Sequence, residues 1–191
     1  MHAYFVSHGA PDQVLRDDAT TRAWRALFSG RAEPRAFLVA TAHWTTAEVA
    51  VESGDTPGTI HDFSGFPREL HQRRYAAPGD PALAAEVVRR LGEAGLAARA
   101  VRRGFDHGVW VPLSLLRPAA DIPVIPISVQ PGRDAAHHHA VGRALRPLVA
   151  EGCVVIGSGG ATHALGELAP RGAGQPAWVA EFSAWLTRAL E

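Results

Sequence analysis

Short apolar runs alternate along the chain with longer amphipathic stretches. The runs are rich in β-branched and aromatic residues, which favour strands, whereas Ala, Leu and Arg recur with helical spacing in the stretches between them. This alternation is typical of βαβ units around a mainly parallel sheet with helices on its faces, an α/β fold. The pattern predicts strands at Ala3–Ser7, Ala36–Ala42, Ala97–Val101, Pro123–Ser128 and Cys153–Ser158, and helices at Asp18–Ser29, Pro67–Tyr75, Pro81–Glu93, Val111–Leu116, Ala135–Glu151 and Ala177–Ala189.

Local chemistry marks one helix and one loop. Asp80 followed by Pro81 supplies an N-cap with proline at the first helical position, and Gly95 stops the same helix. The segment between Glu48 and Gly65 is rich in Gly, Pro, Asp and Thr, and it is long for a connection in a compact domain. We therefore expect it to be a functional loop.

Size and composition narrow the classes of protein. A chain of 191 residues with 47% hydrophobic residues is ordinary for one α/β domain, folding alone or as a small homo-oligomer. Lys plus Arg (19) balance Asp plus Glu (19), so neither nucleic acid nor an anionic membrane surface is an expected partner.

Two further features bear on the compartment. The start resembles no signal peptide, and no apolar run approaches the roughly 20 residues that cross a bilayer, so we expect a cytoplasmic protein. Cys153 is the only cysteine, which excludes disulfides within the chain and cysteine metal clusters. Because it lies in an apolar run, we expect it to be a small buried residue.

Three of the ten histidines come soon after predicted strands. His8, His43 and His163 each come after an apolar run and have small neighbours, which let imidazole and backbone approach a common point. Open α/β sheets bind ligands beyond the carboxyl ends of their strands. For one such histidine alone, a hydrogen-bonded structural imidazole is the better interpretation. Three together favour a site for one divalent metal ion.

A fourth histidine, His107, lies in a turn bounded by glycines. Asp106 or another carboxylate could orient its ring for acid/base work. A capping turn before the helix Val111–Leu116 explains the same spacing equally well.

Other candidate residues have two interpretations. Trp44 and Trp110 adjoin the candidate histidines, so they either wall a pocket for an aromatic ligand or belong to the core. The run His137–His139 falls within a predicted helix, where consecutive residues point in different directions, so a solvated helix face explains it better than a metal site.

Several motifs, taken in order, resemble those of a known family. They are Ser7-His8-Gly9-Ala10-Pro11, Ala42-His43-Trp44, Ile60-His61-Asp62-Phe63-Ser64-Gly65-Phe66-Pro67, Tyr75-Ala76-Ala77-Pro78-Gly79, Gly104-Phe105-Asp106-His107-Gly108-Val109-Trp110-Val111-Pro112-Leu113, Asp121-Ile122-Pro123-Val124, and Gly157-Ser158-Gly159 followed by His163. The chain resembles the class III extradiol ring-cleavage dioxygenases, specifically the 4,5-DOPA extradiol dioxygenase-like branch. The resemblance spans nearly the whole chain and implies a single extradiol dioxygenase-like catalytic domain over residues 1–191.

The resemblance implies a non-haem Fe(II) or Zn(II) site. His8 and His43 match metal ligands, and His163 matches a position used for acid/base catalysis or ligation. His107 matches a second histidine of the pocket, one that contacts substrate. In that chemistry a catechol-type diol binds the metal through both oxygens, O₂ binds beside it, and a histidine moves protons while the ring opens.

Residues around the site follow from the same resemblance. The loop that contains His61 and Phe66 would border the substrate, next to Trp44, Trp110 and Asp106.

Two departures from the family's pattern keep other functions open. Family members run several tens of residues further, and that tail supplies another metal-ligating histidine, whereas this sequence stops at Glu191. Ala164 follows His163 where the family commonly has Asn. One alternative is therefore a truncated, non-catalytic metal-binding member. A zinc hydrolase, with His107 positioning the attacking water, ranks last because the sequence offers no zincin-type Glu base.

Overall fold

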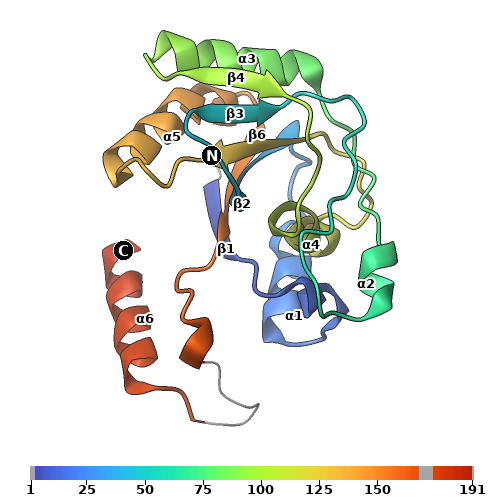
Figure 1. Ribbon diagram of the computed structural model, residues 1–191, viewed down its shortest axis with the longest axis vertical. Coiled ribbons are helices and arrows are strands. Elements are labelled where there is room, and N and C mark those ends of the chain that lie inside the picture. The colour runs from blue at the N-terminus through green and yellow to red at the C-terminus, as the bar shows by residue number, and fades with distance from the viewer. Residues whose placement is uncertain (1–2, 168–173, 191) are drawn as a thin grey trace. The chain divides into compact units, whose positions relative to one another are not determined.

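The computed structural model describes residues 3–167 and 174–190 of the chain. These residues form two compact units, one ending at Ala161 and the other beginning at Thr162. In the first unit a central sheet carries helices on both faces (Figure 1). In chain order its elements are β1 (Ala3–Ser7), the 3-10 helix η1 (Pro11–Leu15), α1 (Ala19–Leu27), β2 (Ala36–Thr45), β3 (Val49–Glu52), α2 (Arg68–Gln72), α3 (Pro81–Glu93), β4 (Ala98–Val101), α4 (His107–Leu116), β5 (Val124–Val129), α5 (Ala135–Ala150) and β6 (Cys153–Gly159).

The sheet confirms the predicted α/β class with a mainly parallel arrangement. Its six strands have the order β1-β6-β2-β5-β3-β4. All neighbours pair in parallel except β3 and β5, which run antiparallel. The carboxyl ends of β1, β6, β2 and β5 therefore meet at one edge, where ligands bind in folds of this kind.

Alternation of side chains along the strands builds one core on each face. In β2, Phe37 and Val39 pack into the core beneath α1 and α4, whereas Ala36 and Leu38 pack into the core beneath α3 and α5. Because the side chains on both faces of these strands are buried, the strands appear in the sequence as unbroken apolar runs. Cys153 is buried in the second of these cores, as predicted, and burial raises the pKa of its thiol.

Some predicted boundaries were wrong. The segment expected to be a loop from Glu48 begins with β3, whose four residues are all buried between β5 and β4. Four residues are too few to show a clear pattern beside the preceding strand. The helix expected from Val111 begins at His107, because buried apolar residues of the core continue back through its first turn.

The second unit contains η2 (Leu165–Glu167) and α6 (Ala177–Leu190). Within it the indole N–H of Trp178 donates a hydrogen bond to Glu167 at 2.6 Å, and the rings of Phe182 and Trp185 lie tilted against each other with centroids 5.6 Å apart. None of the helices in the described parts of the chain has both the length and the apolarity needed to span a membrane.

The predicted N-cap of α3 allows a test of how much one local interaction contributes to the stability of the fold. The Asp80 carboxylate accepts a hydrogen bond from the Leu83 amide at 2.9 Å, so we expect Asp80→Ala to lower the free energy of unfolding by about 1 kcal/mol. Urea denaturation followed by circular dichroism measures the loss. Asp80→Ser keeps a capping oxygen, so its free energy of unfolding should be close to that of the original protein. An equal loss of stability in both variants would contradict the capping role.

Candidate metal centre

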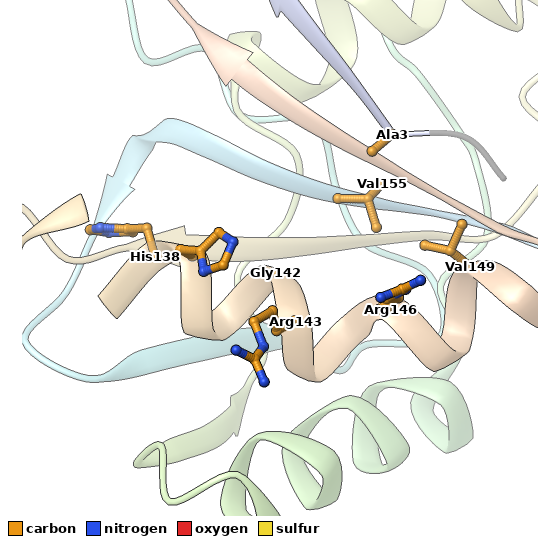
Figure 2. A pocket seen from close by; sticks show the side chains of 8 residues that line it. Ala3, His138, Gly142, Arg143, Arg146, Val149 and Val155 are labelled. Atoms are coloured by element: carbon orange, nitrogen blue, oxygen red, sulfur yellow. The ribbon is translucent and has the colours of Figure 1, made fainter. Parts of the chain in front are cut away.

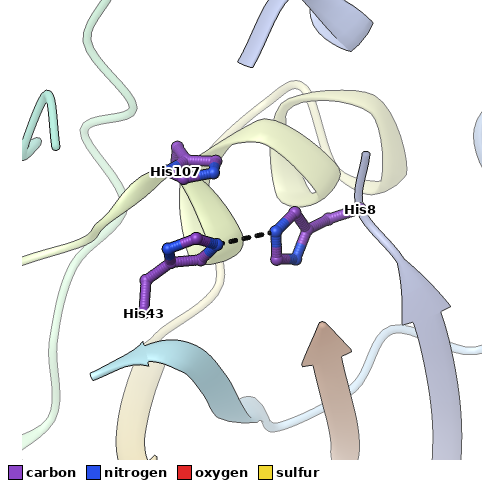
Figure 3. A group of neighbouring side chains, drawn as sticks. All are labelled: His8, His43 and His107. Carbon is purple, nitrogen blue, oxygen red and sulfur yellow. Dashed lines mark hydrogen bonds between the residues drawn. The ribbon is translucent and has the colours of Figure 1, made fainter. Parts of the chain in front are cut away.

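Three histidines from separate elements converge at the carboxyl edge of the sheet. His8 directly follows β1, His43 lies near the end of β2, and His107 is the first residue of α4 (Figure 3). A ring nitrogen from each lies within 4.8 Å of the others. The Nε2 atoms of His8 and His43 are 2.9 Å apart, and the rings of His43 and His107 have centroids 3.8 Å apart.

The sheet topology explains this convergence. β1 and β2 both pair in parallel with β6, so the histidines at their ends lie on either side of the same strand. The His8 amide continues this ladder by donating to the carbonyl of Gly159 at 3.1 Å. His8 and His107 are buried, whereas the His43 side chain is 29% exposed. The group therefore has one side that a ligand can approach.

A serine at the end of β6 sets the proton position on His8. The Ser158 hydroxyl donates to the carbonyl of Gly108 at 2.5 Å, so its oxygen is left to accept from Nδ1 of His8, 2.9 Å away. A proton on Nδ1 leaves the lone pair on Nε2, the nitrogen that faces His43. This is the tautomer that a metal ligand bonded through Nε2 requires.

One carboxylate faces the other two rings. Asp62 Oδ2 lies 3.0 Å from Nδ1 of His107 and 3.6 Å from Nδ1 of His43. Both are ion-pair distances, and the His107 ring lies off the line of a good hydrogen bond. The other carboxylate oxygen accepts from the His107 amide at 2.9 Å. Burial alone would raise the pKa of Asp62, but the interactions with His107 outweigh it and lower that pKa to about 2.

A short backbone pairing delivers Asp62 to this place. Thr59 forms a parallel bridge with Phe105, and the Ile60 amide donates to the Phe105 carbonyl at 2.7 Å. Because the two segments run in the same direction from this bridge, Asp62 and His107 arrive side by side. The segment predicted to be a functional loop thus contributes a charged group to the centre.

A second carboxylate, Asp106, supports the centre from behind. It is fully buried, accepts from Thr41 at 2.8 Å and forms a 2.7 Å ion pair with Arg103. Arg103 also donates to the carbonyl of His43 at 3.1 Å and lies over the ring of Trp44 at 5.1 Å. The expected contact of Asp106 with substrate stays a prediction, and the carboxylate that lies beside the His107 ring is Asp62.

Aromatic residues border one side of the group. Phe63 meets the edge of the His107 ring at 5.9 Å between centroids, and Phe66 packs against Phe63 at 5.5 Å. Trp110 is fully buried in the core and donates its indole N–H to a backbone carbonyl, so core packing accounts for it. His61 Nε2 lies 3.0 Å from the carbonyl of Arg73.

His163, the third predicted ligand, follows β6 within the second unit, just before η2. Its role in ligation or acid/base catalysis stays a prediction, as do the substrate contacts expected of His61, Phe66 and Trp44. Within the first unit the histidine that joins His8 and His43 is His107.

The three imidazoles fit a divalent metal ion. Two nitrogens that each bind one ion at about 2.0–2.1 Å lie roughly 3 Å apart, comparable with the 2.9 Å separation of the His8 and His43 Nε2 atoms. Imidazole nitrogens suit zinc and iron alike. Acceptors for the Nδ1 protons are in place behind the rings, as at established metal sites.

A cavity of about 510 Å³ lies away from these histidines. It is bounded by α5 and by Ala3 and Val155, which pair across β1 and β6 (Figure 2). Arg143 and Arg146 of α5 are among the residues that line it. It contains no residue of the histidine group, so the chemistry of the centre does not depend on it.

Comparison with known proteins identifies the family. Residues 4–191 match the family described as the catalytic LigB subunit of aromatic ring-opening dioxygenase. The chain belongs to the LigB family. The resemblance predicted from the motifs is therefore confirmed, and the family is one of catalytic dioxygenases.

Relatives of this LigB-family chain carry matching names. The 4,5-DOPA dioxygenase extradiol of Beta vulgaris is 43% identical over 98% of this chain and 72% of that protein. The protein of the same name from Escherichia coli strain K12 is 38% identical over 97% of this chain and 69% of its own length. The crystal structure of an uncharacterized protein from Escherichia coli K12 aligns with a TM-score of 0.80 and 33% identity, covering 97% of this chain and 71% of that one.

Sequence reasoning missed two polar residues of this LigB-family centre. Asp62 and Ser158 both lie within the family motifs, where the neighbouring histidine and glycines give the stronger signal. The available signal was chemical: buried imidazoles need acceptors for their ring protons, and a motif that carries histidine often carries the acceptor too.

Gly108 offers a test of how closely the centre is packed. A Cβ atom there would lie 2.6 Å from Thr41 Oγ1 and 3.0 Å from Cδ2 of His43. We therefore expect Gly108→Ala to lower the free energy of unfolding by about 1–3 kcal/mol, although alanine favours helices. The matched control is Gly92→Ala in α3, where a Cβ meets nothing within 4 Å and about 0.5–1 kcal/mol should be gained. Urea denaturation measures both, and equal stability of the two variants would refute the packing argument.

Proposed function

We propose that this LigB-family chain opens the ring of a catechol-type aromatic diol with O₂, beside the hydroxyls, at one divalent metal ion. The observation that carries the proposal is the convergence of His8, His43 and His107 at the carboxyl edge of the sheet. Relatives named 4,5-DOPA dioxygenase extradiol support an aromatic diol as the substrate class. The aromatic side chains of Phe63 and Phe66 beside the group suit a planar ring.

Of the two ions that the sequence predicts, Fe(II) or Zn(II), Fe(II) suits this reaction better. When bound, it supplies redox chemistry that lets O₂ react with the diol, whereas zinc has none. An oxygenase site must also keep positions open for substrate and O₂, and the partly exposed side of the group, at His43, is compatible with that. A cytoplasmic location and a small homo-oligomer stay predictions.

The histidines take different roles in this proposal. His8 and His43 hold the ion through Nε2. The reason is that Nδ1 of His8 donates its proton to a hydrogen bond with Ser158, and Nδ1 of His43 faces the Asp62 carboxylate. His107 lies beside them with Asp62 at its Nδ1, so it takes a proton from a hydroxyl of the diol and returns it as the ring opens. His163 is predicted to assist as a further ligand or acid/base group.

The ligand assignment is tested by metal content. We expect His8→Ala and His43→Ala each to lose most of the bound metal, because each removes one of two ligands, and His107→Ala to keep it. Elemental analysis after loading with Fe(II) and removing free ion measures this. His139→Ala, on the exposed face of α5, is the control and should bind as the original protein does. Loss of metal in His107→Ala equal to that in His8→Ala would make His107 a ligand.

Turnover is tested by anaerobic reconstitution with Fe(II), followed by O₂ and a panel of catechols. We expect O₂ uptake together with a ring-opened product, and a kcat about 10²–10⁴-fold lower in His107→Ala because proton transfer is lost. The His139→Ala variant should keep the original rate. If the loaded protein consumes no O₂ with any catechol of the panel, the dioxygenase proposal fails and the non-catalytic metal-binding alternative is favoured.

A further inference from the structure

We propose that Asp62 is the positioning residue of the metal centre, one carboxylate that orients His43 and His107 together. Its Oδ2 faces Nδ1 of both rings, at 3.6 Å and 3.0 Å respectively. A negative oxygen at this position favours a proton on each Nδ1 and therefore a lone pair on each Nε2. The inference rests on the proposed function, because it concerns the nitrogens that meet the ion and the substrate.

The two oxygens of Asp62 have separate tasks. Oδ1 accepts from the His107 amide at 2.9 Å and so fixes the first residue of α4. Oδ2 is left for the rings. The side chain is 22% exposed, so solvent only partly screens its charge. Oδ1 therefore binds the backbone at His107, while Oδ2 orients the two rings.

The other carboxylate nearby cannot replace Asp62. Asp106 is fully buried and forms an ion pair with Arg103 at 2.7 Å, so a cation offsets its charge. Asp62 faces imidazoles instead, and its charge offsets part of the charge of a bound dication. Carboxylates that hold the outer nitrogen of a ligating histidine commonly raise metal affinity by about 10–100-fold.

Replacement by asparagine separates the two tasks. In Asp62→Asn the amide oxygen can still accept from the His107 backbone, while the NH₂ group presents a donor to the ring nitrogens where the carboxylate presented an acceptor. That donor favours a lone pair on Nδ1 and a proton on Nε2, the wrong tautomer for ligation. Asp62→Ala removes both the acceptor for the His107 amide and the charge that faces the rings.

Zinc is the probe, because it is diamagnetic and its binding does not depend on turnover. Competition with a chromophoric chelator at neutral pH should show zinc bound about 10–100-fold more weakly by Asp62→Asn than by the original protein. Asp62→Ala should bind zinc no more tightly than Asp62→Asn does. Asp55→Asn is the matched control, since its exposed carboxylate contacts only Thr56 among the described residues, and it should bind as the original does.

A spectroscopic readout separates orientation from folding. In long-range ¹H–¹⁵N spectra of the zinc-loaded protein, we expect His43 and His107 to carry their protons on Nδ1, and those signals to shift or vanish in Asp62→Asn while its circular dichroism is unchanged. If Asp62→Asn binds zinc as tightly as the original with the same ring protons, the inference is overturned and the metal site stands. If the original chain binds no zinc, the metal site fails and the inference with it.

Discussion

Buried imidazoles need acceptors for their ring protons, and much of the architecture around His8, His43 and His107 meets that need. Ser158 accepts a hydrogen bond from Nδ1 of His8, and Asp62 faces the other two rings. Each acceptor comes from a segment distant in sequence, so the sheet and the loop must close correctly for the rings to be satisfied. Without these acceptors, burying the rings of His8 and His107 beside His43 would carry a large desolvation cost.

The sheet brings these groups together because its strands are parallel at this edge. β6 lies between β1 and β2 and supplies Ser158, while the carbonyl of Gly108 ties Ser158 to the first turn of α4. A glycine is required at position 108, since any side chain there would meet the ring of His43. Elements from four parts of the chain thus converge at the centre, where the packing leaves no space for a larger side chain at position 108.

The apolar runs were enough to predict most strands, and small residues after them were enough to single out His8 and His43. These signals are local, because burial on both faces produces unbroken apolar runs and a strand end exposes polar residues. The position of Asp62 was not predictable, because it depends on a single bridge between Thr59 and Phe105. β3 was missed because its four residues are too few to show a pattern distinct from the strand before them. The early start of α4 was missed because its turn carries both glycine and apolar residues.

β1 lies at the edge of the sheet and pairs with β6 alone among the strands described. An edge strand of five residues is held by few hydrogen bonds and is among the first segments of a fold to open. An ion shared by His8 and His43 would close a ring of 35 residues and fasten this strand to the centre of the sheet. Loading with metal would then slow amide exchange and proteolysis at the amino end of the chain, far in sequence from the loop that carries Asp62.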